Sequence, residues 1–286
     1  MNHKKLWFPM IIFLFSIVSC QEEIEEKEVY KKIVYIVNGE NMLNYFTHPF
    51  TGEVTEGFIS LYCSGSRMPE KDIDIEIGFD DELIDKFNYI EFEDDTTKYV
   101  KALGDDHFNI PSFRVTIKRG EPFGIMPIYV NPEGLSPDST YVIPLKIVKI
   151  SDYEKSEELS SILYAIRLEN AYSGLYRMTG SLLEEGSSEQ PLQVFKEKTL
   201  VPIDQFSCRM FIATESELEE NIETKTVEFT IGADHLIEIR EENDVLDLGN
   251  SFYDPEKEMF CLNYSFPNGG KRYEIKEKLV RIETDE

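Results

Sequence analysis

Apolar and polar residues alternate along most of the chain after a short polar segment at residues 20–30. The pattern is cleanest at residues 72–77, where three isoleucines alternate with three acids. A period of two places one set of side chains in a core and the other in water, as in a half-buried β-strand. The pattern recurs at residues 113–118, 143–147, 227–231, 237–239 and 260–266. The sequence therefore predicts an all-β protein of the sandwich or barrel type.

The alternation is interrupted at two informative places. Acidic residues in a first turn complement a helix dipole, so a short helix is predicted from Asp80 to Asn88. Residues 152–161 are polar and charged, and a last apolar strand, 162–168, follows them. We predict a domain boundary near residue 170, with one domain at 31–169 and a second at 170–286. In the second, Pro267-Asn268-Gly269-Gly270 indicates a tight hairpin, and a closed meander of such hairpins is an up-and-down barrel.

The N-terminus has the layout of an export signal. Lys4 and Lys5 precede an apolar run, and Ser19-Cys20 ends it. A run of thirteen residues covers about 20 Å as a helix, too little for the roughly 30 Å of a bilayer core. Residues 1–19 therefore resemble a bacterial lipoprotein signal peptide, with Cys20 as the lipidated first residue. An acidic tether, 20–30, follows, and its residues 21–26 resemble the signal that directs Bacteroidota lipoproteins to the cell exterior. A solvated tether without that signal is the alternative.

The chain is strongly acidic, which narrows the class of partner. The 286 residues include 55 acidic and 29 basic ones, a net charge of −26. Loss of residues 1–19 removes two lysines and no acid, which gives −28. Such a surface repels phosphate backbones and anionic head groups, so nucleic acid is excluded as a partner. With Cys20 lipidated, three cysteines remain, which rules out a dense disulfide framework. Cys208 and Cys261 could pair, or stay buried thiols.

Three short segments carry a resemblance to a known group. Tyr141–Ile147, Asn170–Tyr176 and Tyr273–Arg281 are similar to segments of two-domain surface lipoproteins of Bacteroidota. In that group an Ig-like domain, also found ahead of some endo-glycosidases, precedes a lipocalin-like barrel. The resemblance implies an outer-membrane lipid-anchored protein of a polysaccharide-utilisation system, which binds or presents glycan beside an importer complex.

The sequence predicts no catalytic, metal or cofactor site. The histidines after the leader are far apart in the sequence, and no nucleophile elbow or phosphate-binding loop occurs. Asp80-Asp81 and Glu93-Asp94-Asp95 could bind surface Ca²⁺, although solvated acidic loops are favoured. We therefore expect a non-enzymatic protein. A structural or adhesive protein-interaction subunit is the alternative, and a glycosidase with scattered acids is less favoured.

One cluster is a candidate for carbohydrate binding. Sugar recognition uses aromatic faces for stacking, flanked by amide or carboxylate groups for the hydroxyls. Asn250, Phe252, Tyr253 and Asp254 combine these groups in a turn between strands. Adjacent strand residues face opposite ways, so at least one of the two rings should lie outside a core. The alternative interpretation is that one ring fills the barrel end and the other covers it.

Overall fold

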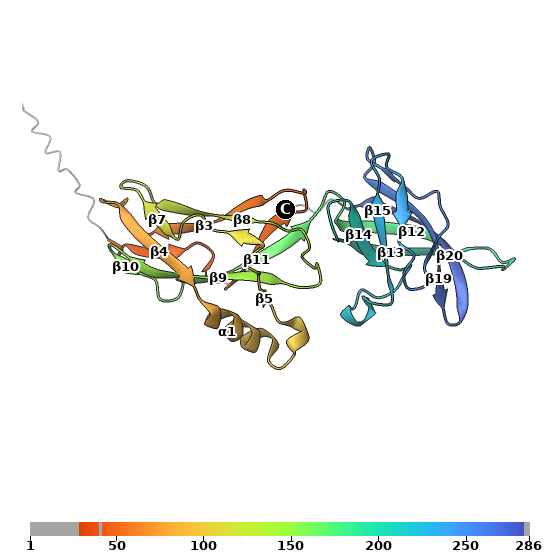
Figure 1. Ribbon diagram of the computed structural model, residues 1–286, viewed down its shortest axis with the longest axis horizontal. Coiled ribbons are helices and arrows are strands. Elements are labelled where there is room, and N and C mark those ends of the chain that lie inside the picture. Colours follow the sequence, from red (N-terminus) through yellow and green to blue (C-terminus); the bar gives the residue numbers. More distant parts are fainter. Residues whose placement is uncertain (1–28, 40–41, 283–286) are drawn as a thin grey trace, which may run out of the picture.

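The computed structural model describes residues 29–39 and 42–282. The predicted leader 1–19, Cys20 and most of the predicted tether 20–30 lie outside these residues. None of the described helices is long and apolar enough to cross a membrane. The described residues form two sheet-built halves that lie end to end (Figure 1).

The first half is a sandwich of two sheets. In spatial order, one sheet contains β10 (Glu154–Lys155), β1 (Ile33–Ile36), β3 (Thr55–Cys63), β8 (Phe123–Val130) and β6 (Phe108–Asn109). The other contains β2 (Leu43–Pro49), β11 (Ser161–Glu169), β9 (Tyr141–Ile150), β4 (Ile73–Phe79) and β7 (Arg114–Ile117), with β5 (Lys101–Ala102) beside β9.

Alternating burial builds the core between these two sheets. Ile73, Ile75 and Ile77 of β4 are buried, and the acids between them are exposed. They pack with inward residues of the facing sheet, among them Ile59 and Met126. The alternation in the sequence thus identified this strand and its buried face.

A helix covers the outer face of the second sheet. It is α1 (Asp81–Phe92), which begins one residue later and ends four residues later than predicted. Leu83 and Phe87 of α1 pack on Val142 of β9 and Leu163 of β11. Because α1 packs on one side and the sandwich core on the other, β9 and β11 are buried on both faces. Two 3₁₀ helices, η2 (Thr96–Lys98) and η3 (Glu219–Asn221), complete the described helices.

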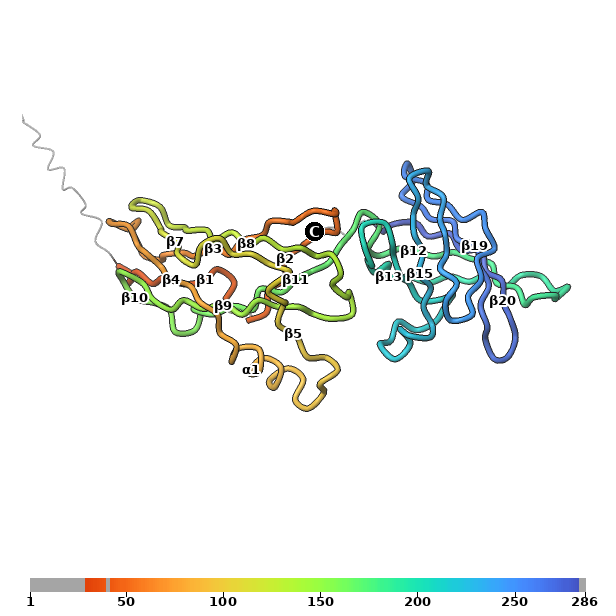
Figure 2. Tube along the Cα trace, in the orientation of Figure 1, coloured from red at the N-terminus to blue at the C-terminus, as the bar shows by residue number. Residues whose placement is uncertain are grey.

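The second half is one sheet that curls into a barrel. The chain enters it once, after β11, as Figure 2 shows. In spatial order its strands are β16 (Ile237–Ile239), β15 (Thr226–Ile231), β14 (Ser207–Phe211), β13 (Leu192–Pro202), β12 (Gly174–Glu184), β20 (Lys271–Arg281), β19 (Met259–Asn268) and β17 (Leu246–Asp247), with β18 (Phe252–Asp254) also beside β19.

The two ends of this sheet meet through backbone contacts. Leu236 and Phe252 form an antiparallel bridge, and the Ile237 N–H donates to the Ser251 carbonyl at 3.0 Å. The predicted tight hairpin is present between β19 and β20, and its loop consists of Gly269 and Gly270 at φ of 61° and 77°. Positive φ at both positions is the type I′ geometry that glycine adopts at low cost.

The predicted fold class is confirmed: an Ig-like β-sandwich precedes a lipocalin-like, nearly closed up-and-down barrel. The interior of the barrel is filled with side chains. Phe260, Tyr176 and Tyr264 are fully buried there, and so are Lys198 and Glu277. The surfaces open to a large ligand are therefore the outer faces of the two halves.

Candidate functional site

The structure separates the four residues predicted to bind carbohydrate. Phe252 of β18 points outward and is 40% exposed, whereas Tyr253 is 9% exposed. The Tyr253 ring lies against Tyr172 and Phe260, with centroids 5.2 and 4.6 Å away. One ring fills the barrel and the other covers it, so only Phe252 offers a face for stacking.

The other two predicted residues also differ in availability. The Asp254 carboxylate accepts a hydrogen bond from Lys257 Nζ at 2.6 Å, and this bond lowers the pKa of Asp254. Its charge is therefore already compensated. Asn250, at φ 59°, borders a hollow of about 360 Å³ on the outside of the barrel, together with Cys261, Asn263, Lys276 and Lys278.

Strand register explains why these side chains share one surface. Phe252 lies opposite Cys261, Cys261 opposite Lys278, and Asn263 opposite Lys276. Directly opposed residues of a β-ladder point to the same side of the sheet. We call this surface, with Asn250 at its rim, the barrel face.

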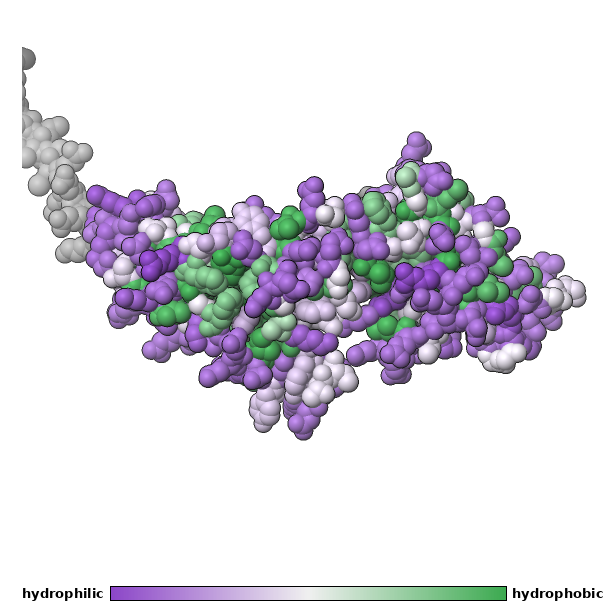
Figure 3. Space-filling view, in the orientation of Figure 1, coloured by the Kyte–Doolittle hydropathy of each residue, from purple (hydrophilic) through white to green (hydrophobic). Residues whose placement is uncertain are grey.

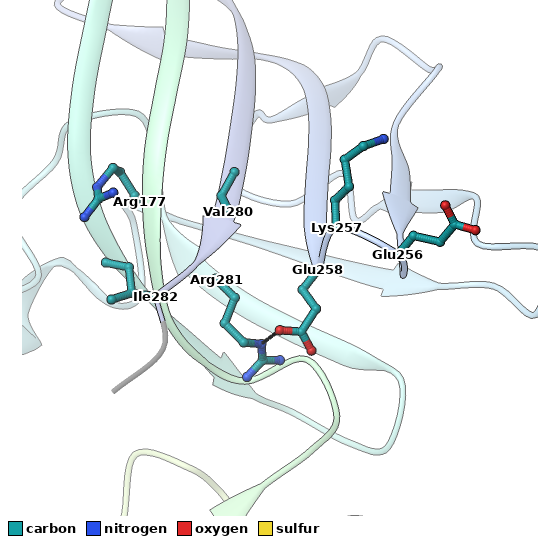
Figure 4. Close-up of a pocket in the computed structure, with 7 residues that line it drawn as sticks. All are labelled: Arg177, Glu256, Lys257, Glu258, Val280, Arg281 and Ile282. Atoms are coloured by element: carbon teal, nitrogen blue, oxygen red, sulfur yellow. Dashed lines mark ion pairs between the residues drawn. The ribbon is translucent and has the colours of Figure 1, made fainter. Parts of the chain in front are cut away.

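A second hollow, of about 620 Å³, adjoins the barrel face where β20 ends (Figure 4). Arg281 and Glu258 point toward each other there and form an ion pair of 3.5 Å. Arg177 of β12 and Lys257 extend from other elements at the rim. Val280 of β20 lies in this hollow, opposite Arg177 in the ladder.

The first half carries a different surface on the outside of the sheet that contains β1, β3 and β8. Register and alternating burial place the same set of side chains on this outer side. They are Tyr35, Phe58, Ser60, Tyr62, Phe123, Ile125, Pro127 and Tyr129, and we call them the aromatic face.

Three rings of the aromatic face lie in contact across three strands. The Tyr62 centroid is 5.4 Å from that of Tyr35 and 4.9 Å from that of Phe123. Phe58 and Phe123 are each 51% exposed, and Ile125 is 59% exposed. Large exposed groups of apolar side chains mark interaction sites on soluble proteins.

A shallow hollow of about 380 Å³ borders the aromatic face at Tyr62. Arg67, Ser66 and Pro122 also line it. A guanidinium and a hydroxyl therefore stand beside the aromatic rings. Polar groups next to an apolar surface are the combination that orients a small ligand or a sugar.

The two outer faces of the sandwich thus differ in a way that bears on function. Apolar residues on the outside of β9 and β11 lie beneath α1. On the opposite outside, no described helix covers the aromatic face. Hydrophilic residues cover most of the surface in Figure 3, with hydrophobic ones gathered in patches on both halves. An uncovered aromatic sheet face on so acidic a chain is therefore a candidate binding surface.

Two of the titratable groups among the histidines and acidic pairs of the sequence, His48 and Asp80, are held by structural contacts. His48 is fully buried between the Thr55 hydroxyl and the Tyr164 hydroxyl, each 2.8 Å from a ring nitrogen. Burial lowers the pKa of His48 to about 4. Asp80 is paired with Lys146 at 3.0 Å. The described residues include no group of three or more His, Cys, Asp or Glu that could hold a metal ion.

The three described cysteines are separate thiols. Cys63, Cys208 and Cys261 form no disulfide bond in the described part of the chain. Cys208 is buried, and burial raises its pKa to about 12. Cys261 is half-buried on the barrel face. Of the two arrangements open from the sequence, the structure shows separate thiols.

The sequence interpretation missed the aromatic face, although a signal was present. In residues 58–62 and 123–129, apolar side chains occupy both odd and even positions. A strand with one face in the core and one face in water would have polar residues at every second position. Such runs predict a strand used on both faces. Lys276 and Lys278 were overlooked because only register brings them beside Asn263 and Cys261.

Two domain-family models match the chain in order. One, described as an N-terminal domain, matches residues 30–154, and one, described as a C-terminal domain, matches residues 160–280. Among curated proteins, none matches this sequence.

Solved structures from Bacteroides have the same fold. A Bacteroides ovatus protein of unknown function is 16% identical, with a TM-score of 0.67 over 87% of this chain and 94% of its own. A multidomain protein of the same species is 15% identical, with a TM-score of 0.62 over 84% and 90%. An auxiliary nutrient binding protein from Bacteroides thetaiotaomicron is 15% identical, with a TM-score of 0.61 over 85% and 91%.

Proposed function

We propose that the chain is a two-domain Bacteroidota protein of the kind whose N-terminal and C-terminal domain models match residues 30–154 and 160–280, and that it is a non-catalytic binding protein for glycan nutrients. The aromatic face of the first half is the proposed binding surface. The nutrient-binding description of the Bacteroides thetaiotaomicron structure, which shares the fold over most of both chains, supports this proposal.

The single observation that carries the proposal is the uncovered group of rings on β1, β3 and β8. Tyr35, Tyr62 and Phe123 follow one another across neighbouring strands. The apolar C–H face of a sugar ring stacks on such aromatic faces, and hydroxyls at the rim bind to polar groups. Stacking of this kind needs no charge, so a neutral glycan suits an acidic protein that repels anions.

The proposal also covers the location of the protein. The resemblance of residues 1–19 and Cys20 to a lipoprotein leader supports a lipid anchor at the outer membrane, facing the exterior. Several acyl chains, each contributing about 0.8 kcal/mol per buried CH₂, would hold the protein there. A neighbouring glycan importer complex would then receive what the aromatic face captures.

The direct test is affinity electrophoresis of residues 21–286 through gels that contain single neutral polysaccharides. Retardation by at least one polymer is expected, and the Tyr62→Ala/Phe123→Ala variant should lose it. The control is Tyr89→Ala/Phe195→Ala, which removes two other exposed rings, 72% and 70% accessible. Equal retardation of both variants, or no retardation of the parent by any polymer, would remove this proposal.

A protein partner is the second candidate function for the same face. The aliphatic members Ile125 and Pro127 and the half-exposed Phe58 favour it, because flat apolar surfaces are typical of protein interfaces. This alternative predicts that the lipid-anchored chain co-purifies with importer subunits. Ile125→Asp should abolish the co-purification, while retardation by neutral glycans persists.

A further inference from the structure

Three cationic side chains of the barrel differ from its other basic residues in having no ion pair or side-chain hydrogen bond within the described part of the chain. They are Arg177, Lys276 and Lys278, and all three are exposed. The other basic side chains of the barrel are engaged by carboxylates or by backbone or hydroxyl oxygens. They are Lys196, Lys198, Arg209, Lys225, Arg240, Lys257, Lys271, Arg272 and Arg281.

Register gathers the three cations on one outer surface. Lys276 and Lys278 lie two residues apart on β20, a step of about 7 Å along a strand. Arg177 lies opposite Val280, two residues beyond Lys278, and points to the same side. We call the three side chains the cationic strip. It joins the hollow beside Asn250 to the hollow drawn in Figure 4.

The three positive side chains gather on one surface of a protein whose overall charge is strongly negative. A protein of net charge −26 has many carboxylates with which to neutralise three exposed cations. On the ladder Lys276 and Lys278 face Thr179 and Ser181 of β12 and Cys261 and Asn263 of β19, which carry no formal charge. Arg177 faces Val280 of β20 on one side and Glu197 of β13 on the other, without an ion pair to that carboxylate among the described residues. The strip is therefore a local positive site with hydrogen-bonding neighbours.

Asn263 offers a hydrogen-bond acceptor beside the cationic strip. Its Nδ2 donates to the Gly249 carbonyl at 3.0 Å, which orients the amide. Its Oδ1 is buried and accepts no hydrogen bond from the described residues. An unused acceptor costs free energy, which a donor such as a hydroxyl recovers on binding. Phe252, opposite Cys261, adds an apolar edge to the same surface.

We propose that the barrel face binds an acidic polysaccharide, with the cationic strip engaging sugar carboxylates and Asn263 engaging a hydroxyl. Charge-assisted hydrogen bonds from lysine or arginine to carboxylate are stronger than neutral ones. An extended chain of uronic acids presents carboxylates and hydroxyls in alternation, which matches cations and amides side by side. This site lies on a different domain from the aromatic face, so it stands or falls independently of the proposed neutral-glycan function.

The test uses calorimetric titration of residues 21–286 with polygalacturonate and with its fully methyl-esterified form. Binding of the acid and not of the ester is expected, and Lys276→Gln/Lys278→Gln should weaken it by roughly tenfold for each lost charged contact. The control, Lys86→Gln/Lys149→Gln, makes the same change in net charge on the first half and should bind like the parent. Dextran sulfate replaces polygalacturonate in a parallel arm, to separate carboxylate recognition from attraction to any polyanion.

The outcomes discriminate clearly. The proposal is overturned if Lys276→Gln/Lys278→Gln binds polygalacturonate as tightly as Lys86→Gln/Lys149→Gln does. It is also overturned if the ester binds as tightly as the acid, if dextran sulfate binds as tightly as the acid, or if the acid does not bind at all. In the same titrations Tyr62→Ala/Phe123→Ala should keep its affinity for polygalacturonate. Loss of neutral-polymer retardation in that variant alone would therefore report on the aromatic face and leave the barrel site standing.

Discussion

At the scale of single residues, Glu277 is the centre of a buried polar cluster in the barrel. Its carboxylate accepts hydrogen bonds from Lys198 Nζ at 2.7 and 2.9 Å and from the Tyr264 hydroxyl at 2.7 Å, all inside the core. Burial lowers the pKa of Lys198, and the carboxylate opposes that effect. Glu277→Gln should lower the free energy of unfolding by about 3–5 kcal/mol, because it leaves a buried cation without its counter-charge. Urea unfolding of residues 21–286 measures this.

Two further variants serve as controls for the Glu277→Gln measurement. Removal of both charges in Lys198→Met/Glu277→Leu should restore much of the lost stability, because a buried pair can be replaced by apolar groups at little cost. Glu274→Gln, on the same strand but outside the core pair, should change little. A Glu277→Gln protein as stable as the parent would show that the pair is not needed for folding.

His48 gives the first half a dependence on pH. Because its folded pKa is about 4 and its unfolded value is 6.5, the unfolded chain binds the proton more readily. The stabilising contribution is complete above pH 6.5 and declines as pH falls toward 4. We expect His48 to account for a loss of about 2 kcal/mol between pH 7 and pH 5. Comparison of urea unfolding of the parent and of His48→Gln at both pH values isolates it, and equal losses in the two proteins would contradict it.

At the scale of elements, α1 serves as a cover for one sheet. Phe87→Ala should lower the free energy of unfolding by about 3–5 kcal/mol, because the ring is buried against the outside of β9 and β11. Ile90→Ala, on the same helix but 52% exposed, is the matched control and should change stability little. Thermal and urea unfolding of both variants measures the difference. Similar values would mean that α1 contributes little to the sandwich.

The elements were largely predictable because their signal is local. Residues 72–77 and Gly269-Gly270 specify a half-buried strand and a type I′ turn within a few residues. The end of α1 was not predictable in this way. Phe92 extends the helix because its ring packs on Phe87, at 6.0 Å between centroids, over the sheet. That contact depends on a sheet whose strands come from distant parts of the chain.

The candidate sites show the same division. Alternation predicted that Phe252 and Tyr253 point opposite ways, and the structure shows this. It could not show which ring fills the barrel, because that depends on Phe260 and Tyr172 across the sheet. The aromatic face and the cationic strip arise from strands paired across long sequence separations. A single sequence does not state that pairing.

At the scale of the whole molecule, two side chains make hydrogen bonds at the junction of the sandwich and the barrel, where β11 also contacts β13. Arg209 of β14 pairs with both oxygens of Asp138, which lies in the loop before β9. Asn170, between β11 and β12, donates to the Asp204 and Ser207 carbonyls at 2.7 and 3.0 Å. Its Oδ1 accepts from the Tyr172 and Ser173 amides at 2.9 and 2.7 Å. One side chain therefore fixes the linker to the barrel.

This junction sets the relative placement of the aromatic face and the cationic strip, and it can be tested apart from ligand binding. Asp138→Ala/Asn170→Ala should widen the distance distribution in small-angle X-ray scattering while each half stays folded, because inter-domain motion is the default once such contacts are lost. Asp106→Ala, which removes a carboxylate with an 86% exposed side chain, should scatter like the parent. A glycan with neutral and acidic blocks would then bind the junction variant more weakly than the parent, since two linked sites reinforce each other only at a compatible spacing. Unchanged scattering in the double variant would mean that other contacts between the halves fix the arrangement.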